Sequence, residues 1–412
     1  MLNVDGRDDE EFKDTEIGRI PKKWEIVKLG DITTLKNGER PLMINDNNVV
    51  PVYGANGVMG YTSKFLVDND FTLVIGRVGA SGEVHIGNGK IWISDNAIYS
   101  ESYDKSKVYL PLLFYLLKFK NLSKFATKST HPIITQSFLN SINLPLPPLP
   151  EQKAIAKVLS TVDEAIQKCN ELIAKTERLK QGLMRELLTK GIGHKEFKDT
   201  EIGRIPKEWE VVKLEEAVKI NRESIDPTRF PDDEFLYVDI ESVENNTGVI
   251  CDAKKIRGKE APLRARRVLH YNDVIMSTVR PYLKAFAIIP KELDNQICST
   301  GFAVLSCGEE VVPRYLLYTI FSDMVINQCT RMMVGGQYPA LNESQVAEIK
   351  VPLPPLLEQQ KIAEILSTID KKLELERKRK EKLERIKKGL MNDLLTGKRR
   401  IPKEMWEKIG GE

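Results

Sequence analysis

The sequence predicts an α+β protein in which two tandem modules are each followed by a long helix. The two helices are expected to pair as an antiparallel coiled coil with pseudo-two-fold symmetry. An eighteen-residue phrase occurs twice, as FKDTEIGRIPKKWEIVKL at 12–29 and FKDTEIGRIPKEWEVVKL at 197–214. A proline phrase also repeats, from LPLPPLPEQ at 144–152 to VPLPPLLEQ at 351–359, and an apolar pattern of helical period follows each copy.

Composition excludes several classes of protein. No run approaches the roughly 18 uncharged apolar residues of a membrane helix, and the acidic start lacks a signal peptide, so a cytoplasmic protein is expected. Four histidines without ligand spacing and cysteines without a CxxC pair argue against a metal site or a disulfide framework. The five cysteines are expected to be small buried hydrophobes: Cys169, Cys251, Cys298, Cys307 and Cys329.

The repeated phrases divide the chain into frames that recur and inserts that differ. The inserts, 30–143 and 215–350, share little sequence, which suits two modules presented alike but reading different things. RIPKEMWEKIG at 400–410 echoes RIPKEWEVVKL at 204–214, as though a third unit began there. The predicted ranges are a disordered segment 1–11, a first module 12–149, a first helix 150–191, a second module 192–356, a second helix 357–397, and a C-terminal segment 398–412 resembling the start of another repeat.

Apolar residues spaced by three or four follow each proline phrase. Ile155, Leu159 and Val162 begin the first series, and Leu366 and Ile369 belong to the second. The first helix is expected to begin at the permitted first-position proline, residue 150, and to extend about 60 Å to about residue 190. The PLPP stretches are interpreted as polyproline joints, for which a plain rigid linker is an adequate description.

Both inserts show short β-rich runs interrupted by glycine, which predicts compact mixed domains. Trp24 and Trp209, in the repeated phrase, are interpreted as core anchors of each module rather than base-stacking platforms. The charged stretch 371–388 is interpreted as a solvated helix face.

Together these marks resemble the specificity subunit of a Type I restriction-modification enzyme. They are DTEIGRIPKKW, PLPPLPEQKAIAKVL and GLMRELLT in the first unit, STVRPYL in the second, and the second copies of the shared phrases. The resemblance implies two target-recognition domains, each reading one half of a split DNA site, with the helices as a ruler. It places methyl transfer on modification subunits that bind S-adenosylmethionine, and ATP-driven, magnesium-dependent cleavage on a restriction subunit. The chain itself is then no enzyme and needs no cofactor.

The residues support this independently. Two similar modules around an approximate two-fold axis suit the symmetry of duplex DNA. The sequence lacks GxxxxGK[ST], HExxH and NPPY-like motifs, which disfavours an autonomous DNA-modifying enzyme. A tandem coiled-coil scaffold without DNA specificity remains an alternative. The stretch 371–388 has two further interpretations, docking on a modification subunit or non-specific attraction to phosphate.

Residues 254–284 carry the strongest signal for DNA contact, with nine Lys or Arg residues against two acids. This density is typical of a loop that follows phosphates, and arginine can also bind guanine through two hydrogen bonds. A solvated surface loop is the alternative. The candidates are Arg257, Lys259, Arg264, Arg266, Arg267, Arg280, Tyr282 and Lys284.

In the first module Arg77 and Ser81 lie in a glycine-rich turn, where LVIGRVG at 73–79 matches VIMSTVR at 274–280. The glycines permit close approach of the backbone to DNA or simply a tight turn. KSTHP and GGQYP align before the two proline phrases, where base contacts or plain loop turns are both possible. The candidates there are Lys128, Thr130, His131, Gln337 and Tyr338.

Overall fold

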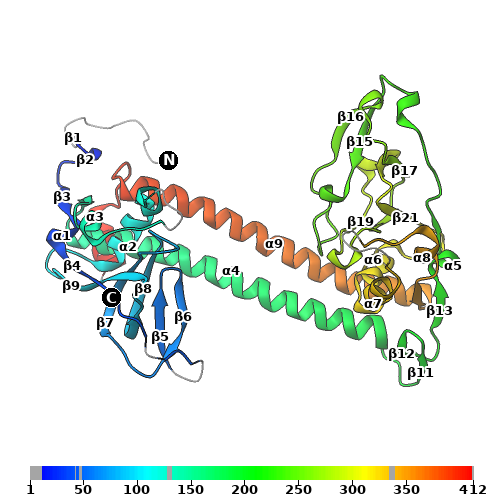
Figure 1. The fold of residues 1–412 in the computed structure, drawn as a ribbon, viewed down its shortest axis with the longest axis horizontal. Helices are drawn as coiled ribbons and strands as arrows, with labels where there is room; N and C mark the ends of the chain where they lie inside the picture. Colours follow the sequence, from blue (N-terminus) through cyan, green and yellow to red (C-terminus); the bar gives the residue numbers. More distant parts are fainter. Residues whose placement is uncertain (1–11, 42, 46–48, 128–131, 334–338, 411–412) are drawn as a thin grey trace. The chain divides into compact units, whose positions relative to one another are not determined.

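The computed structural model describes residues 12–41, 43–45, 49–127, 132–333 and 339–410. They form two compact units (Figure 1). The first unit comprises residues 1–171 and 377–412, and the second comprises 172–376. The boundary runs through both long helices, so each unit contains one module, the first half of its own helix and the second half of the other. The predicted segment 1–11 lies outside the described residues.

The repeated phrase forms the same structure in each unit. A hairpin comes first, β1 (Phe12–Thr15) with β2 (Gly18–Pro21) and β11 (Phe197–Thr200) with β12 (Gly203–Pro206). The next strands, β3 (Glu25–Lys28) and β13 (Glu210–Lys213), pair with β10 (Asn143–Leu146) and β22 (Lys350–Leu353). The proline phrase therefore starts as a strand, so neither a polyproline joint nor a plain linker describes its first residues. A two-stranded pair tolerates proline because one edge of each strand has no ladder partner.

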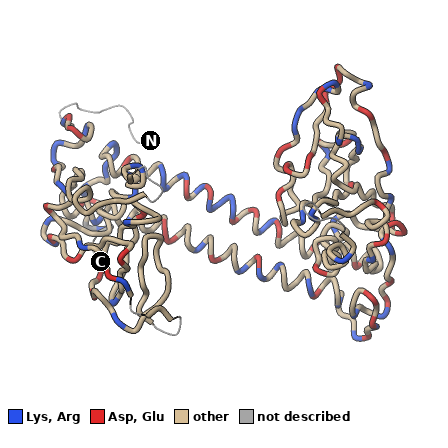
Figure 2. The backbone as a smooth tube through the Cα atoms, in the orientation of Figure 1, with Lys and Arg blue, Asp and Glu red and all other residues tan. Residues whose placement is uncertain are grey.

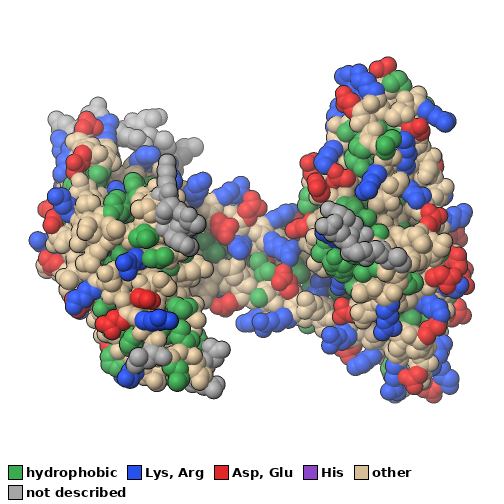
Figure 3. Space-filling model, in the orientation of Figure 1, with side chains coloured by type: hydrophobic (Ala, Val, Ile, Leu, Met, Phe, Trp, Pro, Cys, Tyr) green, Lys and Arg blue, Asp and Glu red, His purple; other side chains and the backbone are tan. Residues whose placement is uncertain are grey.

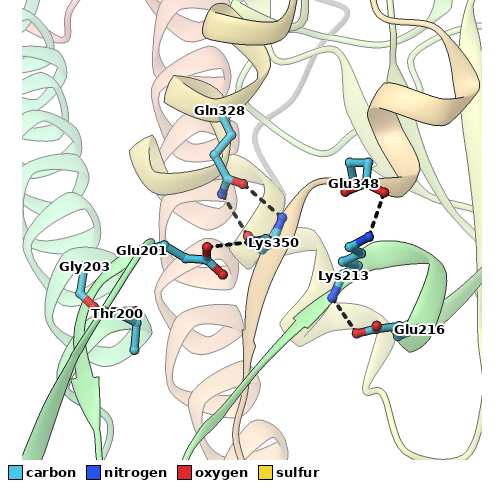
Figure 4. Close-up of polar contacts among 8 residues, drawn as sticks. All are labelled: Thr200, Glu201, Gly203, Lys213, Glu216, Gln328, Glu348 and Lys350. Carbon is cyan, nitrogen blue, oxygen red and sulfur yellow. Dashed lines mark hydrogen bonds and ion pairs between the residues drawn. The ribbon is translucent and has the colours of Figure 1, made fainter.

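Side chains tie the hairpin of the second unit to its last strand (Figure 4). Glu201 pairs with Lys350 at 2.5 Å, and Lys213 pairs with Glu348 at 2.7 Å. The Gln328 amide makes two hydrogen bonds, of 2.8 and 2.9 Å, with the backbone of Lys350. In the first unit Glu16 accepts a hydrogen bond from Asn143, the residue that corresponds to Lys350. The frame therefore keeps one geometry in both copies.

The two predicted helices are confirmed as α4 (Leu149–Lys190) and α9 (Leu356–Leu395). Asp163 pairs with Lys387 at 2.5 Å in the first unit, and Asp370 pairs with Lys180 at 2.6 Å in the second. In the first unit Glu151, near the start of α4, binds Arg400 just after α9, whereas Asp163 binds Lys387 within α9, so the two segments run antiparallel. Tyr115 and Tyr318 donate to the same two aspartates, at 2.8 and 2.6 Å.

Each tryptophan of the repeated phrase is a core anchor, as predicted, with 1% and 0% exposure. Trp24 Nε1 donates to the buried Glu151 carboxylate at 3.2 Å, and Arg400 binds that carboxylate through two hydrogen bonds of 2.9 and 2.7 Å. Trp209 Nε1 donates to Glu358 at 2.9 Å. We call these two clusters the carboxylate locks.

In the second lock, His194 takes the place that Arg400 holds in the first. Its Nε2 lies 2.9 Å from Glu358, and its Nδ1 lies 3.8 Å from Glu208. Glu208 replaces Lys23, the single charge change in the repeated phrase. The one charge change in the repeated phrase therefore lies beside the second lock.

The two inserts share a topology although they share little sequence. In the first unit one six-stranded sheet has the order β4-β9-β7-β8-β5-β6, and in the second two four-stranded sheets have the orders β14-β21-β18-β19 and β16-β15-β20-β17. In both, an edge ribbon joins through a parallel pair, β5 on β8 and β15 on β20. The sheet strands of the first unit are β4 (Thr33–Asn37), β5 (Val50–Gly54), β6 (Gly57–Thr62), β7 (Val67–Gly76), β8 (Val84–Ile93) and β9 (Ala97–Tyr103).

The difference in sheet number has a local cause. β7 and β8 each run for ten residues, whereas the matching stretches of the second unit are divided in two. β17 and β18 follow the course of β7, and β19 and β20 follow that of β8. The strands of the second unit are β14 (Val218–Ile220), β15 (Glu234–Val238), β16 (Lys254–Arg257), β17 (Ala265–Leu269), β18 (Val274–Ser277), β19 (Phe286–Ile288), β20 (Gln296–Ser299) and β21 (Phe302–Cys307).

Short helices pack on the sheets and connect them to the long helices. The first unit contributes α1 (Leu29–Ile32), α2 (Leu110–Lys120), the 3-10 helix η2 (Leu122–Phe125) and α3 (Gln136–Asn140). The second contributes α5 (Leu214–Ala217), α6 (Pro313–Phe321), α7 (Asp323–Met332) and α8 (Glu343–Ala347). Near the C-terminus, α10 (Lys403–Gly410) is helical, so the segment that echoes the repeated phrase in sequence does not repeat its hairpin.

Two further expectations can be compared with the structure. Cys169, Cys298 and Cys329 are buried, but Cys251 is exposed and Cys307 only half-buried, so the prediction of five buried cysteines is wrong for these two. Cys251 follows a surface bridge and Cys307 ends β21, where burial is incomplete. The stretch 371–388 lies within α9 and is largely exposed, with its basic residues spread along the helix (Figure 2).

Candidate nucleic-acid interface

The same backbone junction occurs in both units, at the end of β7 and at the end of β18. Val78 bridges Ile133 in the first unit, and Val279 bridges Ala340 in the second. These bridges match the correspondence expected between 73–79 and 274–280. Nearby backbone bonds repeat as well, because Arg77 accepts from Ile134 at 3.0 Å and Thr278 accepts from Leu341 at 2.9 Å. We call these places the first and second junctions.

At the first junction, a turn carries Arg77 away from the end of β7. Arg77 N donates to Asn96 O at 2.8 Å, and its guanidinium reaches Asp95 O at 3.4 Å while staying on an exposed side of the turn. Ser81 is only 5% exposed. Its hydroxyl lies 2.8 Å from Arg77 O and close to Pro132 O, and its one proton can serve either. Ser81 is therefore placed to hold the turn rather than to meet a ligand.

Glycines in this turn have packing roles, with one exception. A Cβ on Gly76 would lie 2.2 Å from Ala80 O, and a Cβ on Gly82 would lie 2.4 Å from Ser123 N. Gly79, with φ +86°, has no atom within 4 Å of its Cβ position. Of the two interpretations of these glycines, a tight turn therefore explains Gly76 and Gly82, and only Gly79 leaves room for close approach of another molecule.

An exposed lysine that sequence reasoning missed, Lys124, borders the first junction. The contact between Gly82 and Ser123 puts η2 directly beside the turn, with Lys124 exposed on it and Phe125 50% exposed. The signal was available, because residues 105–150 contain six lysines and neither Asp nor Glu.

His85 is a second residue that sequence reasoning missed. It lies at the start of β8, and its Nε2 is 3.3 Å from Ala55 O, the turn of the β5–β6 ribbon. Burial, and to a smaller degree the nearby Lys118, lowers the pKa of His85 below its usual value. The imidazole is therefore neutral at pH 7, and its hydrogen bond anchors the turn of the ribbon.

The predicted basic loop 254–284 is not a loop. It forms β16, β17 and β18, and five of its nine basic side chains have acidic partners. The expectation of a loop is therefore wrong, whereas contact of its basic residues with phosphates stays a prediction. The neutralising acids lie far away in the sequence, so a count within the segment could not detect them. The pairs are Lys254 with Asp239, Lys255 with Glu234, Arg266 with Asp226, Arg267 with Glu343, and Lys284 with Asp323.

Two of the predicted arginines do reach the second junction. Arg264 is exposed, and its carbonyl oxygen accepts a hydrogen bond from Thr300 N at 2.8 Å. The next residue, Gly301, accepts a hydrogen bond from Thr278 N of the second junction at 2.8 Å. Arg280 N donates to Pro339 O at 2.9 Å. Arg257 and Lys259, by contrast, lie on and just after β16, an edge strand on the opposite side of its sheet from β17.

The backbone after the second junction is strained. Arg280 and Lys284, with φ of 47° and 57°, flank a short 3-10 turn, Pro281–Leu283, and both adopt a left-handed conformation that costs about 1 kcal/mol or more for a residue with a Cβ. Tyr282 is 44% exposed at the tip. Such strain concentrates at functional sites. Lys284 Nζ also donates to Phe321 O at 2.9 Å, which anchors this end of the turn.

The remaining candidates are Lys128, Thr130, His131, Gln337 and Tyr338, and they lie outside the described residues. Within the described ranges, no cluster of three metal-binding side chains occurs. Nor is any helix in that part of the chain long and apolar enough to cross a membrane.

Comparison with known proteins identifies the family. A family model described as the Type I restriction modification DNA specificity domain matches residues 21–178 and 206–385. The chain belongs to this family. The MjaVIII specificity subunit of Methanocaldococcus jannaschii is 32% identical over 419 residues, covering 95% of this chain and 97% of the relative. The EcoDI specificity subunit of Escherichia coli is 21% identical and covers 84% and 81%.

Solved structures agree on the fold. The S subunit of a Type I restriction-modification system from M. genitalium superposes with a TM-score of 0.64 at 19% identity, covering 90% of this chain and 96% of that one. The prediction of a specificity subunit that is not itself an enzyme is confirmed by membership of the family. The α+β architecture with two long helices is confirmed as well.

Proposed function

We propose that each unit of this specificity subunit reads one half of a bipartite site in double-stranded DNA through its junction. The observation that carries this proposal is a shared backbone with different side chains. Both junctions have the same bridge and flanking hydrogen bonds, but Arg77 is replaced by Thr278 and Gly79 by Arg280. A common frame that presents different polar groups suits two readers of different half-sites.

The other parts of the proposal concern spacing and partners. α4 and α9 set the distance between the half-sites, and the chain scaffolds modification and restriction subunits in the cytoplasm. S-adenosylmethionine, ATP and magnesium belong to those subunits, and this chain binds none of them. The family model describes a DNA specificity domain. No observation supports either alternative, a tandem scaffold that lacks DNA specificity or an autonomous DNA-modifying enzyme.

The salt dependence of DNA binding tests the two junctions. Arg77→Ala and Arg264→Ala, one in each unit, should each reduce the slope of log K against log salt by about 0.9, because one phosphate contact is lost. If either arginine binds a guanine instead, its loss should weaken cognate binding by about 1–3 kcal/mol and relax preference at one base pair. The measurement is a titration of cognate and scrambled duplexes over a salt series.

Lys207→Ala is the matched control, because Lys207 pairs with Glu196 in the repeated frame of the second unit, outside the insert that carries the second junction. Its slope should match that of the parent chain. If both arginine variants also kept the parent's slope, affinity and sequence preference, the junctions would not be the places where this protein contacts DNA.

A further inference from the structure

The β5–β6 ribbon of the first unit exposes large apolar side chains along its outer strand, β6. Val58 is 48% exposed, Met59 51% and Tyr61 39%. The neighbouring segment adds Met43 at 65% and continues along the ribbon, because Asn45 N donates to Tyr61 O at 2.8 Å. Hydrophobic side chains gather over this part of the first unit in the space-filling view (Figure 3). A group of this size marks a surface that meets another molecule.

The turn of this ribbon is fixed to the first junction. Ala55 O accepts from His85, and it lies 2.8 Å from the position of a Cβ on Gly76, the last residue of β7. Ser94 N donates to Tyr53 O at 2.8 Å, which ties the end of β5 to the end of β8. The Met59 sulfur lies over Gly54, 3.0 Å from its Cβ position. The apolar edge therefore begins at the turn that carries Arg77.

Charge around the ribbon indicates which occupant fits. The turn beside it carries Arg77 and contacts η2, on which Lys124 is exposed, so basic side chains flank the apolar edge. An exposed two-stranded ribbon flanked by basic side chains fits duplex DNA, because the major groove admits a β-ribbon while phosphates line its rims. Apolar side chains in that groove distinguish thymine from the other bases through its methyl group.

The ribbon of the second unit provides a contrast within the same chain. β15 and β16 occupy the same place in the topology, since β15 pairs in parallel with β20 as β5 does with β8. Its edge strand has the sequence KKIR at 254–257, which is basic where β6 is apolar. The two ribbons therefore present different chemistry from an equivalent position, as readers of two different half-sites would.

We propose that Val58 and Met59 are specificity-determining residues that contact the 5-methyl group of thymine in the half-site of the first unit. The proposal rests on the function proposed above, and it adds a chemical class of base to one of the two half-sites. No such contact is expected from the ribbon of the second unit, whose edge offers charged groups.

Replacing thymine with deoxyuridine removes this methyl group and nothing else. The full chain is reconstituted with its modification subunits, its target is found by sequencing methylated DNA, and each thymine is then replaced singly. At one or more positions in one half-site, replacing thymine with uracil should lower the affinity of the parent complex for DNA about fourfold, because one buried methyl group is lost. The double variant Val58→Ala/Met59→Ala should bind thymine and uracil equally at those positions.

The control is Val249→Ala, an exposed valine (50%) in the second unit, which should keep the parent's preference for thymine. The proposal is overturned if the double variant keeps that preference, if uracil is tolerated everywhere, or if the target contains no thymine in the affected half-site. It is also overturned if the double variant only impairs assembly with the modification subunits or only abolishes self-association. A parent complex without sequence preference would instead refute the function proposed above.

Discussion

Replacing Glu151 with glutamine should lower the free energy of unfolding of the first unit by about 3 kcal/mol, the scale for removing one partner of a buried ion pair. The Glu151 carboxylate is fully buried, and Arg400, 28% exposed, would lose both of its charged hydrogen bonds. Guanidinium cannot release its proton to relieve the imbalance. The measurement is denaturant unfolding, with hydrogen exchange used to assign the loss to one unit.

The matched variant is Glu358→Gln in the second unit. Its loss should be clearly smaller, because an imidazole in its neutral form is an ordinary hydrogen-bond partner for an amide, whereas a guanidinium always keeps its charge. Trp209 Nε1 donates to one carboxylate oxygen of Glu358 and Ile192 N to the other, so the amide oxygen can keep one of these two hydrogen bonds. Equal losses in the two variants would show that the identity of the basic side chain in each lock does not matter.

Inserting seven residues into α4 after residue 171 and seven into α9 after residue 376 should lengthen the preferred spacer by about three base pairs. A heptad keeps the apolar seam, adds about 10 Å and leaves a residual rotation of about 20° per helix. Three base pairs correspond to about 10 Å of duplex. Methylated-site sequencing of the reconstituted complex measures the spacer.

Insertion into α4 alone is the control, since it shifts the register of the helix pair and should destabilise the chain. Unchanged spacing together with unchanged affinity in the double insertion would rule out the helices as the ruler.

Local and periodic patterns in the sequence were sufficient to predict the long helices. The three- and four-residue steps that begin at Ile155 predicted a helix, and the proline permitted at its first position placed its start within one residue of the start of α4. Trp24 and Trp209 were correctly assigned to the core, because the tryptophan and the residues around it occur in both copies of the repeated phrase. The repeated phrases thus contained enough information to specify the frame of each unit.

The candidate site was harder to predict, because it depends on contacts between distant residues. Arg266 and Arg267 were grouped with Arg264 by charge, but only tertiary structure reveals that Asp226 and Glu343 neutralise them. The apolar edge of β6 carries no charge, so a search for basic residues passed over it. The common topology of the inserts was also invisible, because strand pairing constrains hydrogen bonds more than side-chain identity.

The most direct test of the account exchanges residues 30–143 for the corresponding span of a related specificity subunit with a known, different target. The repeated frame supplies the same joints on both sides of this insert, since β3 pairs with β10 as β13 pairs with β22. After reconstitution with modification subunits, methylated DNA is sequenced. The account predicts that one half-site changes while the other half-site and the spacer remain as they were. A change in both half-sites, or in neither, would contradict it.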